Sequence, residues 1–261
     1  MLTTVVGLSA ASSIQAATFG GDVTVVTDYI YRGISENDGR PAAQFDLHAG
    51  ADNGLFAGLW GTTLNARGTP PVPPPATMGP AGDFEIQPYV GMRFPFSSNW
   101  SATVSAVDYV YLHSEYGASH DYQELSVAVQ YLDGLTVSLA ASPNAVHYWR
   151  GFRVGRYESY DASVSGEWPL LGPFSLTAGA GYYYLAGPSS HTAVVLTAMG
   201  PQSVTTHWGT QGYSYGNIGL AAEYGAWRVD VGYYFSDKQS ENLFPYSGRN
   251  NRAAAALSWR F

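Results

Sequence analysis

The 261-residue chain contains no cysteine and a single lysine, Lys238. The absence of cysteine excludes disulfides and thiolate metal sites. Charged residues make up 12% of the chain, which is about half the usual share in a soluble globular protein. The formal net charge is -8, and a nucleic-acid partner would call for the opposite, clustered Lys and Arg. We therefore expect no nucleic-acid partner.

The chain also lacks an apolar run of about 20 residues, the length that a transmembrane helix requires. Aromatic residues nevertheless reach 15%, led by 20 tyrosines, and the mean hydropathy is near neutral at -0.09. A transmembrane β-barrel combines these properties, because only every second residue of each strand must be apolar. The alternative is a soluble sandwich with cross-strand aromatic pairs, but its outer face would carry more Lys and Glu.

Apolar residues recur at every second position in segments of about ten residues. In 227–235, Trp227, Val229 and Val231 share one face, and Arg228 and Asp230 share the other. A strand separates these two sets, whereas a helix would mix them. We predict an all-β, transmembrane, antiparallel up-and-down β-barrel of about twelve strands, with both termini periplasmic. The predicted strands are 21–31, 42–51, 55–65, 83–95, 100–112, 121–132, 135–142, 157–168, 174–186, 211–224, 227–236 and 251–261.

Ten or fourteen strands remain alternatives, since 55–65 and 135–142 are the weakest segments. The pattern of 100–112 changes face near Ala106, which suggests a β-bulge. Aromatic residues at strand ends are expected at the membrane interfaces. They are Tyr29, Tyr31, Trp100, Tyr109, Tyr111, Tyr131, Trp168, Tyr182, Tyr184, Trp227, Tyr233 and Phe235.

The expected connections alternate between short turns and long loops, which is typical of outer-membrane barrels. Short turns such as 52–54 and 133–134 contain Asn-Gly or Asp-Gly, the chemistry of tight hairpins. The proline-rich stretch 68–80 cannot hold a strand ladder. The expected long loops are 32–41, 66–82, 113–121, 143–156, 187–210 and 237–249.

The first 17 residues are uncharged and end in small residues, which favours a secretory signal peptide at 1–17 before a barrel domain at 18–261. No basic residue precedes the apolar stretch, so an N-terminal arm is the alternative. Together with the barrel pattern, the signal peptide predicts export through the periplasm to an outer membrane.

Charged residues within the predicted strands should face the lumen, because a lipid-facing Arg or Lys costs roughly 2–4 kcal/mol at mid-bilayer. The pore-lining candidates are Asp28, Arg32, Asp46, His48, Glu85, Arg93, Glu124, Asp161, Glu167, Glu223, Arg228, Asp230 and Arg260. Carboxylates outnumber bases in this set, which favours cations. Asp28 and Arg32 are expected on the inward face of the first strand, roughly 13 Å apart, each with a partner on a neighbouring strand.

The alternative for the lumen is a narrow barrel, cross-braced by Arg–carboxylate pairs and filled by aromatic side chains. The aromatic candidates for such filling are Tyr89, Tyr183, Tyr213, Tyr215 and Tyr234. The basic aromatic stretch 144–157 could contact lipopolysaccharide, form a constriction or pack as an ordinary loop.

Catalysis is not expected. The chain has no G-x-S-x-G elbow, and five of its six histidines fall in loops or at strand ends, leaving His48 within a strand. No histidine pair has metal-binding spacing, so we expect neither a metal nor a cofactor.

The chain ends in Leu257, Trp259 and Phe261, which alternate with Ser258 and Arg260. We expect the first three to face lipid, with Phe261 at the periplasmic interface of a strand that closes the barrel. This ending resembles the signal that the barrel-assembly machinery recognises.

Residues 24–60, with Thr27-Asp28-Tyr29-Ile30-Tyr31-Arg32-Gly33-Ile34-Ser35 followed by Arg40-Pro41-Ala42, resemble the opening hairpin of the TorF-like porin family. The resemblance implies a barrel with a pore in the outer membrane of a Gram-negative cell, and it implies no substrate and no catalytic residues. The expected function is passive diffusion of small hydrophilic solutes, with a preference for cations. The alternatives are a closed barrel that acts through its loops and, more remotely, a lipid-modifying enzyme. The oligomeric state stays open.

Overall fold

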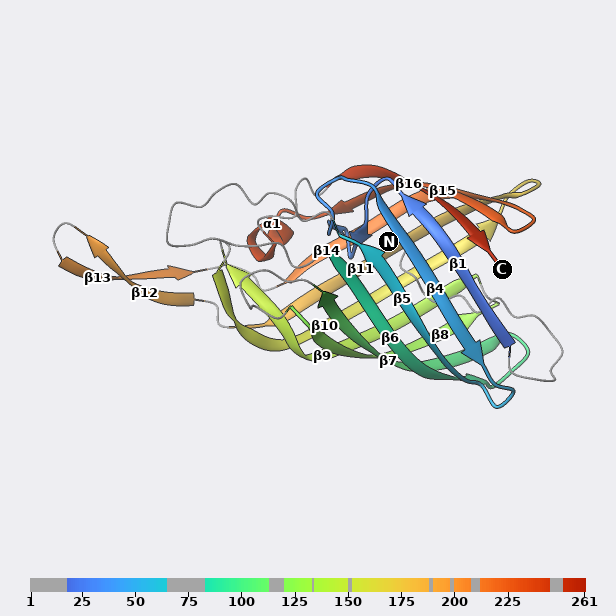
Figure 1. Ribbon diagram of the computed structural model, residues 1–261, viewed down its shortest axis with the longest axis horizontal. Helices are drawn as coiled ribbons and strands as arrows, with labels where there is room; N and C mark the ends of the chain where they lie inside the picture. Colours follow the sequence, from blue (N-terminus) through green and yellow to red (C-terminus); the bar gives the residue numbers. More distant parts are fainter. Residues whose placement is uncertain are drawn as a thin grey trace.

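Twelve strands form one closed antiparallel barrel in the computed structural model (Figure 1). The model describes residues 18–64, 83–112, 120–132, 134–149, 152–187, 190–197, 200–207, 212–244 and 251–261. The barrel strands are β1 (Thr18–Val26), β4 (Ala42–Gly50), β5 (Leu55–Thr63), β6 (Phe84–Pro95), β7 (Trp100–Leu112), β8 (Tyr122–Tyr131), β9 (Leu135–Trp149), β10 (Phe152–Pro169), β11 (Phe174–Ala186), β14 (Gly212–Tyr224), β15 (Trp227–Ser236) and β16 (Arg252–Arg260). The predicted all-β class and strand number are confirmed.

Pairing of the first and last strands closes the sheet, from Asp22 opposite Arg260 to Val26 opposite Ala256. Phe261 continues this pairing, because its N–H donates to the carbonyl of Gly21 at 3.0 Å and its own carbonyl accepts from Gly21 at 3.1 Å. Closure leaves no unpaired edge in the barrel sheet, which is what a bilayer requires of a β-structure.

The two faces of the barrel wall differ as the alternation predicts. On β15, Val229 and Val231 are exposed on the outside, whereas Arg228 and Asp230 are buried on the inside. Exposed aromatic rings gather at the short-turn end of the outer surface: Trp100, Tyr131, Trp168, Trp227 and Trp259. Others gather toward the long-loop end: Tyr160, Tyr182, Tyr184, Tyr233 and Phe235. An apolar band between aromatic girdles is the surface of a transmembrane barrel.

The first predicted strand is too long. β1 ends at Val26, and Ile30–Tyr31 (β2) and Ile34–Ser35 (β3) form a separate two-stranded sheet. The expected bulge near Ala106 is also wrong, since β7 keeps one register with β6 and with β8. The alternation of polar and apolar residues breaks because the inward-facing Val107 is apolar. Its side chain packs against a hydrophobic cluster within the barrel.

Most of the predicted loop 143–156 is strand. β9 and β10 pair as far as Trp149 and Phe152, with register shifts between Arg153 and Gly155 and between Tyr157 and Ser159. Pro143 lies at the second shift and has no partner in the ladder, so its missing N–H breaks no pair.

The predicted loop 187–210 contains a second small hairpin, formed by β12 (Ser190–Thr197) and β13 (Gly200–His207), which projects away from the barrel (Figure 1). The predicted loop 237–249 contains the five-residue helix α1 (Gln239–Leu243), and Leu243 is buried against the barrel interior. The hairpin depends on strand pairing and the helix on packing, and the amino-acid composition of the loops predicts neither. The signal peptide 1–17, the proline-rich stretch and most of the loop 113–121 lie outside the described residues.

Candidate functional site: the barrel lumen

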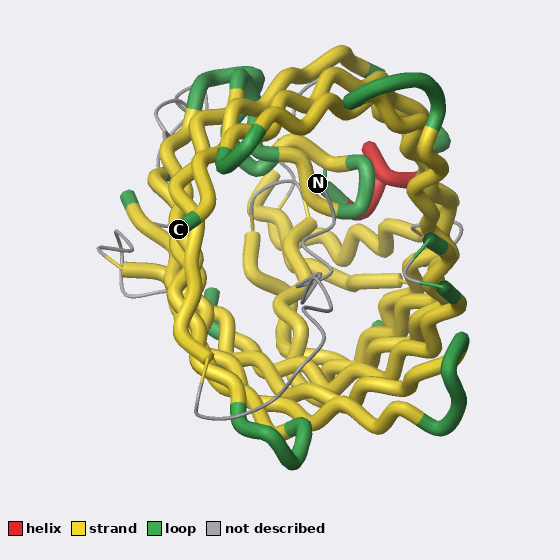
Figure 2. The backbone as a smooth tube through the Cα atoms, turned by 90° about the vertical axis from the view of Figure 1, so that its right-hand side faces the viewer, coloured by secondary structure: helices red, strands yellow, loops and turns green. Residues whose placement is uncertain are grey.

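Residues 27–41, which connect β1 to β4, fold into the barrel rather than over its rim; they are called the inward segment here. Segments within the ring of strands are visible in Figure 2. Tyr29 packs on Trp60 of β5, with ring centroids 5.5 Å apart. Ile34, on the other arm of the segment, is buried in a cluster with Tyr183 and Tyr213. The segment is therefore packed against two parts of the wall.

Arg32 spans the lumen from the inward segment to two strands that are not neighbours. Its Nη2 lies 2.8 Å from Glu124 Oε2 on β8, and its Nε lies 3.2 Å from Asp161 Oδ2 on β10. The guanidinium also lies 4.6 Å from the ring centroid of Tyr31 and 5.2 Å from that of Tyr183. The planar guanidinium of arginine can donate to both carboxylates from its edges while its faces contact the two aromatic rings.

Asp28 ties the inward segment to the last strand. One carboxylate oxygen accepts from Ser35 Oγ at 2.7 Å, and the other lies 2.5 Å from Arg252 Nη1 on β16. The predicted placement of Asp28 and Arg32 on a barrel strand is wrong, because the chain leaves the wall at Val26. Asp28 does have its partner on a neighbouring strand, whereas Arg32 reaches across the lumen.

Gly33 allows this path for two reasons. Its φ of +76° is disfavoured for residues with a side chain. A Cβ there would also lie 2.8 Å from the carbonyl oxygen of Phe235 and 2.9 Å from Tyr215 Cβ. The segment thus approaches the β14–β15 wall too closely for any other residue.

Along the β4–β6 wall, carboxylates are held by neutral donors and one histidine. Asp46 accepts from the Tyr89 hydroxyl at 2.9 Å and lies 2.5 Å from His48 Nδ1. Glu85 accepts from Gln87 Nε2 at 2.6 Å, and its other oxygen has no hydrogen-bond partner.

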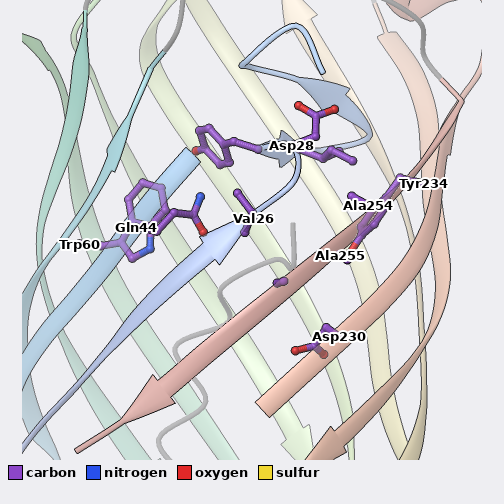
Figure 3. A pocket seen from close by; sticks show the side chains of 11 residues that line it. Val26, Asp28, Gln44, Trp60, Asp230, Tyr234, Ala254 and Ala255 are labelled. Atoms are coloured by element: carbon purple, nitrogen blue, oxygen red, sulfur yellow. The ribbon is translucent and has the colours of Figure 1, made fainter. Parts of the chain in front are cut away.

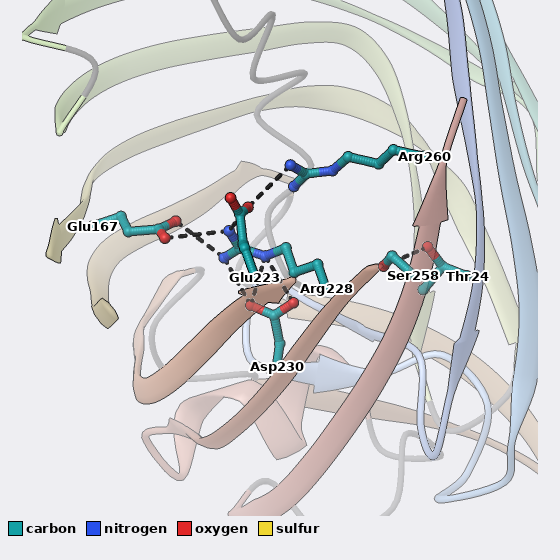
Figure 4. Close-up of polar contacts among 7 residues, drawn as sticks. All are labelled: Thr24, Glu167, Glu223, Arg228, Asp230, Ser258 and Arg260. Carbon is teal, nitrogen blue, oxygen red and sulfur yellow. Dashed lines mark hydrogen bonds and ion pairs between the residues drawn. The ribbon is translucent and has the colours of Figure 1, made fainter. Parts of the chain in front are cut away.

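A second charged cluster extends from Asp230 to Glu223 and Arg260 beside the short turn between β14 and β15 (Figure 4). Arg228 contacts Asp230 and Glu223 at 2.8 Å each and Glu167 at 3.0 Å. Arg260 also contacts Glu223 at 3.0 Å. Three carboxylates against two arginines leave this end of the lumen acidic.

A pocket lies between the inward segment and the wall formed by β1, β4, β5, β15 and β16 (Figure 3). Asp28 and Tyr29 line it from the inward segment, and Trp60 and Asp230 line it from the wall. Ala254 also lines it, and its small side chain leaves this space open.

The structure places the charged candidates on the inside of the barrel or in the inward segment. It joins Arg32 with Glu124 and Asp161, and Arg228 with Glu223 and Asp230, whereas Arg93 contacts Ser101 at 3.2 Å. Sequence reasoning missed the inward tyrosines of the segment and β7, which it assigned to the membrane interface. Tyr29, Tyr31, Tyr109 and Tyr111 lie inside the barrel instead. The period-two pattern indicated which of these residues share a face. It did not indicate that the chain leaves the barrel wall after Val26.

Among the described residues, no group of three or more His, Cys, Asp or Glu side chains is placed to hold a metal ion. No helix in the described part of the chain is long and apolar enough to span a membrane. In the basic aromatic stretch, Arg156 of β10 donates to the carbonyl oxygens of Asn144 on β9 and of Asp121, which directly precedes β8. The side chains of residues 147–154 are not described.

Closure, an apolar outer band and a charged interior define a twelve-strand barrel of the transmembrane type. The NanC porin has a TM-score of 0.50 with this chain at 12% identity, covering 92% of this chain and 97% of that one. A structure titled for the in-meso crystallisation of membrane proteins has a TM-score of 0.51 at 10% identity, covering 93% and 83%. These likenesses concern the fold.

The chain belongs to the Gcw_chp family, described as bacterial proteins of unknown function, whose profile matches residues 10–259. The search of curated proteins found no match.

Proposed function

We propose that this protein is an outer-membrane channel for passive diffusion of small hydrophilic solutes, with a preference for cations. The observation that carries the proposal is a charged lumen inside an apolar outer band. Carboxylates outnumber arginines on the inside of the described barrel, and an acidic lining attracts cations at close quarters. The resemblance of residues 24–60 to TorF-like porins supports the same function.

The inward segment would limit conduction. It contacts β5, β8, β10 and β16 through named pairs, so solutes must pass beside the Arg32 bridge. In this proposal residues 1–17 direct export, both termini are periplasmic, and the long-loop end faces lipopolysaccharide. The barrel-assembly machinery would recognise the ending that contains Phe261.

A specific observation favours a second function, a closed barrel that acts through its external loops. Aromatic contacts and ion pairs hold the inward segment against opposite walls of the barrel, as expected of a plug that closes the lumen. The two functions differ in whether the native barrel conducts.

Conductance in planar bilayers distinguishes them when a variant without the inward segment is included. Val26 and Ala42 face each other in the β1–β4 register, so a short Gly-Ser turn can replace residues 28–40. A matched control replaces residues 190–207, the hairpin that projects away from the barrel.

We expect stepwise, cation-preferring conductance from the native protein, several-fold larger steps from the 28–40 replacement, and unchanged steps from the control. A silent native protein with a conducting 28–40 variant would favour the closed barrel. If both were silent, the channel proposal would be wrong.

A further inference from the structure

Glu85 on β6 is the most deeply buried of the charged lumen candidates, with 1% of its surface exposed. Its Oε1 accepts a hydrogen bond from Gln87, and the hydroxyls of Tyr29 and Tyr111 lie close enough to interact with the carboxylate, but its Oε2 is fully buried and makes no direct hydrogen bond. Buried carboxylates are ordinarily paired with a cation or fully hydrogen-bonded. Asp28, Glu124, Asp161 and Asp230 each have an arginine, and Glu85 does not.

The groups around Glu85 offer no positive charge among the described residues. Tyr29 and Glu36 face it from the inward segment, and Tyr109 and Tyr111 face it from β7. Thr62 stands opposite on β5 and is itself fully buried. The surroundings are thus neutral or acidic, and a second carboxylate, that of Glu36, repels any charge on Glu85.

We propose that Glu85 and Glu36 form a proton-binding site, and that a proton bound there holds the inward segment in the lumen. Glu85 belongs to the wall, and Glu36 belongs to the segment, where its N–H donates to the carbonyl oxygen of Tyr29 at 2.8 Å and Tyr29 in turn faces Glu85. Repulsion between the two carboxylates therefore acts between the wall and the segment, the two parts that would separate if the segment moved. A bound proton reduces their mutual repulsion and the cost of burying Glu85. A metal ion fits less well, because hard cations need six or more oxygen ligands and the described residues gather no such group.

Glu36 sets the direction of the pH dependence. Burial, aided by the charge of Asp28, raises the pKa of Glu36 from 4.5 to about 7. A raised pKa means that the seated segment holds its proton more tightly than the released segment does. The stabilisation of the seated state is therefore complete below pH 4.5 and is lost as pH rises to about 7.

Release of the segment can be measured without conductance, because the chain has no native cysteine. Ile30→Cys places one thiol at a position of the segment that is 2% exposed. Its rate of reaction with a dithiopyridine reagent, which reacts with thiols even in acid, reports how often the segment opens. Asp38→Cys, at an exposed position of the same segment, corrects for the intrinsic pH dependence of the thiol.

We expect the ratio of the two rates to rise at least tenfold between pH 5 and pH 7.5, since one proton gives up to a tenfold change per pH unit. Glu85→Gln removes the charge and should flatten the rise, and Glu36→Gln should do the same. A flat ratio in the native background, or an equal rise in both Gln variants, overturns the proposal. So does a ratio that follows added Ca²⁺ or chelator at fixed pH, which would indicate a metal instead.

The proposal depends on the proposed function only for its consequence, a conductance that grows with pH. A pH-dependent labelling ratio in a barrel that never conducts would refute the channel and leave the proton site standing. A conducting barrel with a flat labelling ratio would refute the proton site and leave the channel standing.

Discussion

Replacing Arg32 by methionine should release the inward segment while the barrel stays intact. The side chains of Arg32, Glu124 and Asp161 are only 7–10% exposed, so this is a buried ion triad. Removing one member of a buried ion pair costs about 3–5 kcal/mol, because the partner charge is left unpaired. Methionine preserves most of the volume, so the loss measures charge rather than a cavity.

Taking the lower end of this range, about 3 kcal/mol, the open fraction of the segment should rise roughly a hundredfold. The assay is the labelling rate of Ile30→Cys relative to Asp38→Cys, in the Arg32→Met background. Arg32→Lys should have a smaller effect, because an ammonium keeps the charge but cannot present two edges to two strands.

Two controls test the reasoning. The triple variant Arg32→Met, Glu124→Gln, Asp161→Asn has no unpaired charge and should recover most of the native protection. If Arg32→Met alone lowered the free energy of opening the inward segment by less than about 1 kcal/mol, the ion pair would behave as an exposed one does. Such a result, or a triple variant no better protected than the single one, would refute the buried-triad explanation.

Three other predictions concern different parts of the chain. Gly33→Ala should raise the labelling of Ile30→Cys at least tenfold, because a Cβ would press on the Phe235 carbonyl at 2.8 Å. Arg228→Met should increase cation preference, measured as the reversal potential in a salt gradient, because three carboxylates lose their shared partner. Deleting Phe261 should reduce the membrane-inserted fraction, measured by heat-modifiable gel mobility, and normal insertion would contradict its role in closure.

The barrel could be predicted because alternation is a local property. Val229, Val231 and the charges between them indicate two faces whatever the rest of the chain does. The same rule failed after Val26, where Tyr29 and Tyr31 occupy alternate positions but no longer belong to the barrel wall. Period two identifies a face, and it does not distinguish an aromatic at the membrane interface from one packed inside the lumen.

The path of the inward segment is set by contacts far away in the sequence. Gly33 and the turn at Asp38-Gly39, both with positive φ, are visible locally as a loop. That the loop turns inward depends on Glu124, Asp161 and Arg252, which no local pattern connects to it. The candidate charges were therefore found, but their partners were not.

The bond between Asp28 and Arg252 joins residues 224 positions apart. Contacts of this sequence separation form late, because the loop they close is nearly the whole chain. The inward segment contacts β5, β8 and β10 through Tyr29 and Arg32, but its anchor at Asp28 cannot form until the last strand is present. A chain interrupted before β16 would lack both the β1–β16 seam and this anchor. The ion pair between Asp28 and Arg252 therefore makes complete anchoring of the inward segment depend on the last strand of the chain.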